Sequence, residues 1–301
     1  MSKVITDKQN ALNNVTIVGK LVDVVMRNGV TNNMDWQSAT MNIQVTQTYG
    51  GREETSIVPV SMFANKYTKD NKPNPGWTQI NDLQNYPSVQ SVGLADAVTL
   101  RITKANLREN NYVSKTTGQL INMWQLNTSF VNTTNNTPNT ASFVIDIYIM
   151  SIDDELDRDG EPTGRLKIQG GIVQYGGTLD VLNFVVENPD SVNFIRANWE
   201  VNDTVTVKGR IRVTTAEEKK TSSSSWGEDV PETSVRTIRE LVITTGDDCG
   251  KDEEFAYSPE DIKKIYQVRK ARLEQMQLDS QNKVKSTSTN SAATADKYSW
   301  K

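Results

Sequence analysis

Hydrophobic and polar residues alternate along much of the first 250 positions, and a period of two predicts strands rather than helices. In the first half, strands are expected over 15–26, 39–49, 54–63, 98–102 and 121–131. The segment 78–92 has room for one short helix before the fourth strand. The dipeptides Asn28-Gly29 and Gly50-Gly51 are expected to form the turns of a three-stranded meander.

The same order of elements recurs in the second half. Strands are expected over 143–152, 166–175, 179–186, 204–215 and 235–245, with Gly170-Gly171 as a bulge and Gly176-Gly177 as a turn. A helix is expected after the third strand, because Asn188 suits an N-cap and Pro189 the first helical position. Its apolar stripe is Val192, Ile195 and Trp199.

Five strands with a helix between the third and fourth is the order of the OB-fold, a partly open Greek-key barrel. Because the order occurs twice, the sequence predicts a mainly β protein with two tandem OB-fold domains, over 12–134 and 142–250. An Asn- and Thr-rich linker is expected over 135–141.

The two ends of the chain carry different signals. Residues 1–11 are expected to be flexible. Ser258 is a suitable N-cap for a helix over 258–277, whose apolar stripe packs on its own domain or against a partner protein or second subunit. Residues 278–301 have little to bury and are expected to be disordered, with Tyr298 and Trp300 as a hook for a replication partner.

The composition argues against catalysis. The chain has no histidine, the commonest general base and metal ligand, and its single Cys249 lies among acidic residues that disfavour the thiolate. Glu155 to Gly160 lacks the residues of a calcium loop and is interpreted as a charged hairpin turn. We therefore expect no enzyme, cofactor or metal site. Residues 1–10 lack the apolar core of a signal peptide, so a soluble protein of the bacterial host cytoplasm, without membrane contact, is expected.

A basic strand gives the first indication of a ligand. In Val205 to Val213 the apolar residues point one way and Lys208, Arg210 and Arg212 the other, about 7 Å apart. Like charges on one face repel unless an anion lies across them. The chain as a whole is acidic, with a formal net charge of -4, so a local row of cations predicts a polyanionic guest.

The chain resembles the single-stranded DNA-binding proteins of bacteriophages that contain tandem OB-folds. The segment Asn14-Val15-Thr16-Ile17-Val18-Gly19-Lys20-Leu21 is similar to the first strand of bacterial single-stranded DNA-binding proteins. Unlike those relatives, the sequence does not finish in an acidic Pro-Phe tip. The resemblance implies a protein that coats and protects single-stranded DNA in phage replication or recombination, largely independently of sequence, with RNA as a possible ligand.

Candidate contacts are cations for phosphates and aromatic side chains on which bases stack. Trp77 and Trp124 lie beside apolar neighbours and are expected in the core. The candidates are Lys20, Arg27, Trp36, Tyr49, Arg52, Lys104, Arg108, Tyr112, Arg165, Lys167, Tyr175, Lys208, Arg210, Arg212, Lys219, Lys220 and Trp226.

Other interpretations stay open at this point. The cations could be ordinary solvated strand faces, and Trp226 could fold back onto its barrel. The main alternative function is a virion structural or assembly protein that uses OB-like barrels as protein-binding modules. Contacts with replication or recombination proteins through the C-terminal helix or tail, and an oligomer, are further possibilities.

Overall fold

The computed structural model describes residues 12–222, 230–252 and 254–295, with the backbone alone for 216–222, 230–235 and 283–295. The first half contains β1 (Asn13–Thr31), β2 (Met34–Tyr49), β3 (Arg52–Asn65), α1 (Pro75–Leu83), α2 (Val89–Val92), β4 (Thr99–Val113), β5 (Leu120–Thr128) and β6 (Asn132–Thr133). The second half contains β7 (Thr140–Leu156), β8 (Pro162–Gln174), β9 (Thr178–Val186), α3 (Pro189–Asn198), β10 (Thr204–Ser222), β11 (Val230–Gly246) and α4 (Pro259–Ala295).

Each half closes into a five-stranded barrel. In the first, β1, β2 and β3 form an antiparallel meander, β3 runs parallel to β5, and β4 pairs with both β5 and β1. In the second, β7, β8 and β9 form the meander, β9 runs parallel to β11, and β10 pairs with both β11 and β7. This is OB-fold topology twice, so the predicted fold class is confirmed.

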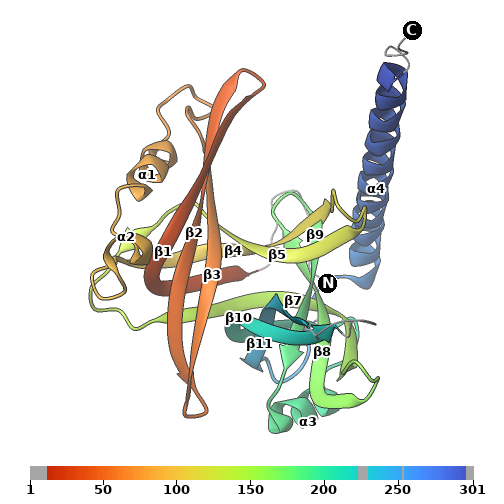
Figure 1. The fold of residues 1–301 in the computed structure, drawn as a ribbon. Coiled ribbons are helices and arrows are strands. Elements are labelled where there is room, and N and C mark those ends of the chain that lie inside the picture. The colour runs from red at the N-terminus through yellow and green to blue at the C-terminus, as the bar shows by residue number, and fades with distance from the viewer. Residues whose placement is uncertain (1–11, 223–229, 253, 296–301) are drawn as a thin grey trace.

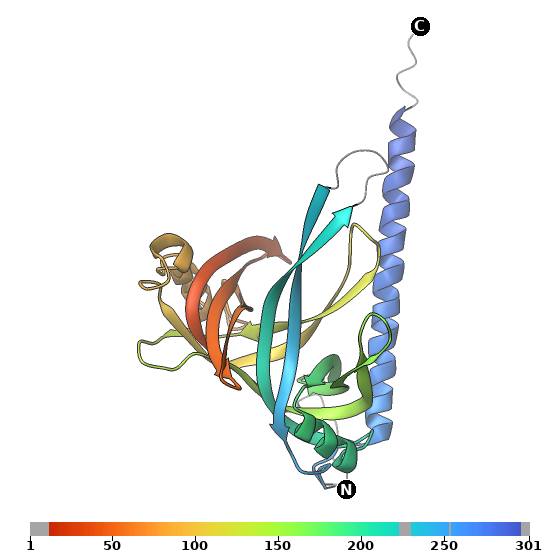
Figure 2. The ribbon, with the colours of Figure 1, turned by 60° about the horizontal axis from the view of Figure 1, so that its bottom comes forward.

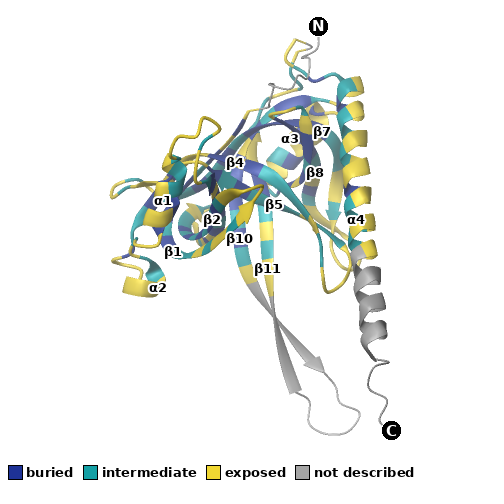
Figure 3. Ribbon diagram, turned by 90° about the horizontal axis from the view of Figure 1, so that it is seen from above, coloured by how far each residue is buried: buried dark blue, intermediate teal, exposed yellow. Residues whose placement is uncertain are grey.

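The two barrels share a strand pairing and a core. Strands β1 and β7 run antiparallel from Asn13 opposite Ile145 to Val18 opposite Thr140, so one sheet passes through both barrels (Figure 1). Buried residues of both halves form one cluster, and Figure 3 shows the buried ribbon continuing from one barrel into the other. The relative position of the barrels is therefore fixed by backbone pairing and by apolar packing.

The turns differ from the predictions at two places. The β1–β2 turn is formed by Asn32 and Asn33, whose φ values are 50° and 61°, and not by Asn28-Gly29, which lies within β1. Asparagine tolerates left-handed backbone, so an Asn-Asn pair can make this turn. The bulge expected at Gly170-Gly171 is also misplaced, since the extra residue is Met150 on β7. Gly170 instead leaves room for the ring of Phe184, which a Cβ would approach to 2.9 Å.

The helices follow their sequence signals. The side chain of Asn188 accepts hydrogen bonds from the backbone N–H groups of Asp190 and Ser191, and Val192, Ile195 and Trp199 are buried as predicted. Helix α4 continues past the predicted end at 277 to Ala295, because the segment between contains no glycine or proline to stop it. Within the described part of the chain, no helix has the length and apolar character needed to cross a bilayer.

Candidate nucleic-acid interface

The outer face of the β1–β2–β3 meander carries exposed and partly exposed aromatic and polar side chains. Arg27, Ser38 and Phe63 lie directly opposite one another on the three strands, and Trp36 lies one row further towards the β1–β2 turn. We call these four residues the Trp36 face. Their neighbours along β2 and β3, Met62 among them, point the other way into the barrel.

Trp36 and Phe63 are stacked on this face. Their ring centroids are 5.9 Å apart with an interplanar angle of 26°, and Phe63 keeps 61% of its surface exposed. The indole N–H of Trp36 donates to Thr31 Oγ1 at 3.1 Å, which fixes the ring orientation. An aromatic pair on the outer face of a strand, with Phe63 exposed and Trp36 partly exposed, is unusual, and it offers a flat platform to a ligand.

Gly29 makes room for the indole. It pairs with Trp36 across the β1–β2 ladder, and a Cβ at this position would lie 2.8 Å from the Trp36 ring. The indole can therefore lie across β1 only because residue 29 has no side chain. The sequence pattern predicts Gly29 as a turn residue, whereas in the structure Gly29 accommodates the Trp36 ring.

Two further residues beside this face were not among the predicted contacts. Lys66 and Tyr67 follow β3, and the Lys66 ammonium lies 5.9 Å from the centre of the Tyr67 ring, which is itself exposed. Lys66 also pairs with Asp35 at 3.2 Å, next to Trp36. Phe63 was not among the predicted contacts either. Its alternation with buried Met62 along β3 was a signal that could have placed its side chain on the outer face of the barrel.

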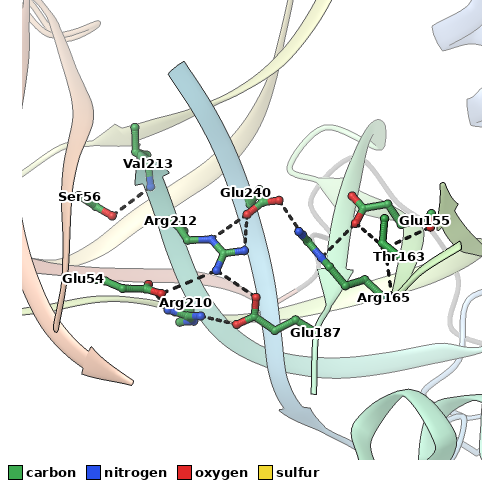
Figure 4. Close-up of polar contacts among 10 residues, drawn as sticks. All are labelled: Glu54, Ser56, Glu155, Thr163, Arg165, Glu187, Arg210, Arg212, Val213 and Glu240. Carbon is green, nitrogen blue, oxygen red and sulfur yellow. Dashed lines mark hydrogen bonds and ion pairs between the residues drawn. The ribbon is translucent and has the colours of Figure 1, made fainter. Parts of the chain in front are cut away.

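The basic strand is not an exposed row of cations, so that prediction is wrong. Lys208 is exposed, but Arg210 is only 5% exposed and pairs with both Glu54 and Glu187 (Figure 4). Its guanidinium also lies 4.0 Å from the centre of the Tyr49 ring. The first barrel's β2–β3 hairpin packs over this part of β10, a contact between distant segments that strand periodicity cannot reveal.

Arg212 and Arg165 belong to the same cluster. Arg212 Nη1 lies 3.0 Å from Glu187, its Nε donates to Glu240 at 2.7 Å, and Arg165 Nη2 donates to Glu240 at 2.6 Å. Arg165 Nε also lies 3.0 Å from Glu155. We call Glu54, Arg165, Glu187, Arg210, Arg212 and Glu240 the ion-pair cluster. It joins β3 of the first barrel to three strands of the second barrel, β8, β10 and β11, and to Glu187, the residue that follows β9.

The charges in this cluster favour the ionised carboxylates. Burial alone would raise the pKa of Glu187, but hydrogen bonds from Arg210 and the charge of Arg212 outweigh it, so the pKa is lowered. Burial likewise acts to raise the pKa of Glu240, and its hydrogen bonds with Arg165 and Arg212 lower it overall. These arginines therefore compensate carboxylates of the protein itself rather than phosphates.

The remaining candidates divide by their surroundings. Three are engaged with protein groups: Lys20 donates to the carbonyls of Ala95 and Ala97, Tyr49 contacts Arg210, and Arg108 pairs with Asp180 at 2.8 Å. Exposed side chains are those of Arg27, Arg52, Lys104, Tyr112, Lys167, Tyr175 and Lys208. The expected face linking Lys167 to Tyr175 is interrupted, because Val173 between them is fully buried.

Three further candidates lie wholly or by their side chains outside the described residues. Lys219 and Lys220 lie within β10, but their side chains are outside the description, and Trp226 lies outside the described residues altogether. The two tryptophans expected in the core are there: Trp124 is buried and Trp77 packs against the buried cluster.

Comparison with known proteins gives a family and a fold. A family model, YorF, matches residues 11–279. The chain belongs to the YorF family. No curated protein matches this YorF-family chain.

Solved structures place the fold of this YorF-family chain. It is similar to the wild-type single-stranded DNA binding protein from Thermus aquaticus, with a TM-score of 0.50 and 11% identity, covering 81% of this chain and 96% of that one. A deletion mutant of the same Thermus protein gives a TM-score of 0.48 and 12% identity, covering 83% and 98%. At 11% identity, the likeness to the wild-type protein shows a shared fold alone, the OB-fold.

Proposed function

We propose that this protein binds single-stranded DNA without enzymatic activity, and that it coats and protects exposed strands during the DNA replication or recombination of a bacteriophage in its bacterial host. The Trp36 face carries this proposal. In an OB-fold, the face of the second and third strands is where oligonucleotides bind. Here that face presents a stacked aromatic pair rather than the charged and hydroxyl groups expected of a purely solvated strand surface.

The chemistry of the Trp36 face suits binding that is largely independent of base sequence. Every base has a π-face, so stacking on Trp36 or Phe63 would tolerate all four, and each stacked base contributes about 1 to 3 kcal/mol. Arg27 lies in the same row as Phe63 and is exposed, so it is available to a phosphate. The shared OB-fold with a protein named for binding single-stranded DNA supports the same assignment.

The ion-pair cluster has no direct part in this proposal. Its three arginines face three carboxylates of the cluster, so releasing them to phosphates would leave Glu54, Glu187 and Glu240 without partners. The exposed cations Arg27, Arg52, Lys104, Lys167 and Lys208 are the better candidates for backbone contacts. We propose that Tyr112 and Tyr175 supply further stacking surfaces.

A titration of the intact chain with a fluorescently labelled dT oligonucleotide tests the proposal. Binding should weaken as salt increases, with a log–log slope of about −0.7 for each phosphate contacted. Oligonucleotides of different base composition should bind with similar affinity, and a matched RNA oligomer measures the preference for DNA. Absence of measurable binding at about 50 mM salt, where phosphate contacts are strongest, would refute the proposal.

A further inference from the structure

A hollow lies on the second barrel, between α3 and the end of β11. Its volume is 340 Å³, and its floor is apolar, since Ile195, Trp199 and Ile243 are all buried there. Phe194 forms part of the wall and remains 42% exposed. We call this hollow the α3 pocket. It lies on the second barrel, whereas the Trp36 face belongs to the first.

The floor of the α3 pocket is held by specific contacts. Trp199 Nε1 donates to the carbonyl of Asp247 at 2.9 Å, and the Asp247 carboxylate accepts from the backbone N–H of Thr206 at 2.7 Å. Gly246 allows Trp199 to lie this close, because a Cβ there would be 3.1 Å from the indole. The pocket is thus a built feature of the barrel and its helix.

The charged side chains that line the pocket are negative. They are Asp190, Asp247 and Asp248, and among the described residues no lysine or arginine lines the pocket. An adjoining hollow shares Gly246, Asp247 and Asp248, and it adds Asp252 and the exposed ring of Phe255. It also includes Lys251, whose ammonium is already paired with Asp146 at 2.7 Å. Aromatic walls with a negative rim repel phosphates, and they fit a peptide that carries aromatic side chains beside cations.

This chain contains such a peptide. Residues 297–301 read Lys-Tyr-Ser-Trp-Lys, two aromatic residues flanked by two cations, and they lie outside the described residues. We propose that this segment of one copy docks in the α3 pocket of a second copy. An aromatic side chain enters the apolar hollow, and the lysines face the aspartates of its rim.

The geometry of α4 explains why the pocket belongs to another copy. The helix has 37 residues and is therefore about 55 Å long, and it starts beside the hollow lined by Phe255 and ends far from α3 (Figures 1 and 2). The six residues after Ala295 span at most about 21 Å when fully extended. They are too short to return along the helix to their own pocket.

Such a contact joins different surfaces of successive copies. It is heterologous, so repetition produces an open row of molecules instead of a closed dimer, unless the rotation happens to close a ring. A row of this kind would suit a protein that coats a strand, but the docking itself does not depend on DNA. A failure of the peptide to dock is therefore distinguishable from a failure of the chain to bind an oligonucleotide.

A labelled peptide of residues 291–301 tests the docking directly. It is titrated against the full chain carrying Tyr298→Ala and Trp300→Ala, which removes competition from the chain's own segment. We expect binding that weakens at least about fivefold with Phe194→Ala and also weakens with Asp248→Asn, because truncation of an aromatic anchor or loss of a rim charge removes the recognised groups. Phe130→Ala, which truncates another exposed phenylalanine outside the pocket, is the matched control.

A mixing experiment tests the head-to-tail arrangement. By light scattering, the unmodified chain should grow in mass with concentration, whereas the Phe194→Ala chain alone and the chain carrying both Tyr298→Ala and Trp300→Ala alone should stay monomeric. An equal mixture of the two variants retains one intact pocket and one intact segment per pair, so it should form dimers and nothing larger. A peptide that does not bind, or that binds Phe194→Ala as well as the control, would overturn the proposal, and so would a mixture that stays monomeric.

Discussion

Replacing Arg210 by methionine tests whether the ion-pair cluster stabilises the two-barrel arrangement. Arg210 is 5% exposed and pairs with Glu54 of the first barrel and with Glu187, the residue that follows β9 of the second. Methionine keeps most of the side-chain volume but leaves both carboxylates without this partner. Breaking a buried ion pair from one side costs about 3 to 5 kcal/mol.

The lower end of that range applies here. Glu54 and Glu187 each keep 31% of their side-chain surface exposed, so water partly solvates the stranded charges. Arg212 also stays 3.0 Å from Glu187. The lost contact with the Tyr49 ring adds about 0.5 to 1 kcal/mol. We therefore expect Arg210→Met to lower the free energy of unfolding by about 3.5 to 4 kcal/mol.

Urea unfolding followed by circular dichroism measures this change, because the free energy of unfolding falls linearly with urea concentration. Lys208→Met is the matched control: it lies two residues away on the same strand, is exposed, and should cost less than about 0.5 kcal/mol. Folded Arg210→Met should keep its affinity for single-stranded DNA within about twofold. Equal stability of the two variants would refute the structural role, and selective loss of DNA binding would restore the role that the sequence pattern suggested.

Three further predictions follow from single contacts. Because the pKa values of Glu187 and Glu240 are lowered in the folded chain, their stabilisation is present above the unfolded pKa of about 4.3 and is lost as the pH falls through the lower folded values; a Glu240→Gln variant should show a shallower loss of unfolding free energy in acid than the unmodified chain. Gly29→Val should displace the Trp36 indole and weaken oligonucleotide binding about tenfold while leaving the fold intact, as checked by binding titration and circular dichroism; unchanged binding would argue against the indole as platform. Arg269→Ala should cost about 3 kcal/mol in urea unfolding, since it leaves the Glu109 carboxylate, 1% exposed, without its α4 partner, and Lys263→Ala on the exposed side of α4 should cost almost nothing.

The fold was predictable because its signals are local and occur twice. Alternation along each strand, the Asn188-Pro189 helix start and the Gly50-Gly51 and Gly176-Gly177 turns all depend on neighbouring residues, and all agree with the structure. Where a local signal had two possible meanings, the prediction failed. Gly29 accommodates a ring from the next strand, and Asn32-Asn33 makes the turn instead.

The site was less predictable because its contacts join distant segments. The period of two correctly put Arg210 and Arg212 on the side of β10 away from the apolar row, but it could not show that Glu54, more than 150 residues earlier, covers that side. Strand alternation likewise could not show that Arg108 pairs with Asp180, which lies on a distant segment. Trp36 was found by its residue type, whereas Phe63 was absorbed into the predicted core strand despite its outward position in the alternation.

The most direct test of the central claim is the affinity of the Phe63→Ala chain for a dT oligonucleotide, compared with that of Phe130→Ala. The two phenylalanines are 61% and 65% exposed, so both truncations remove a similar exposed ring, but Phe63 alone is stacked on Trp36. If bases stack on the Trp36 face, Phe63→Ala should bind about 5- to 150-fold more weakly, and Phe130→Ala should bind as the unmodified chain does. Equal affinities for the two variants would contradict the account.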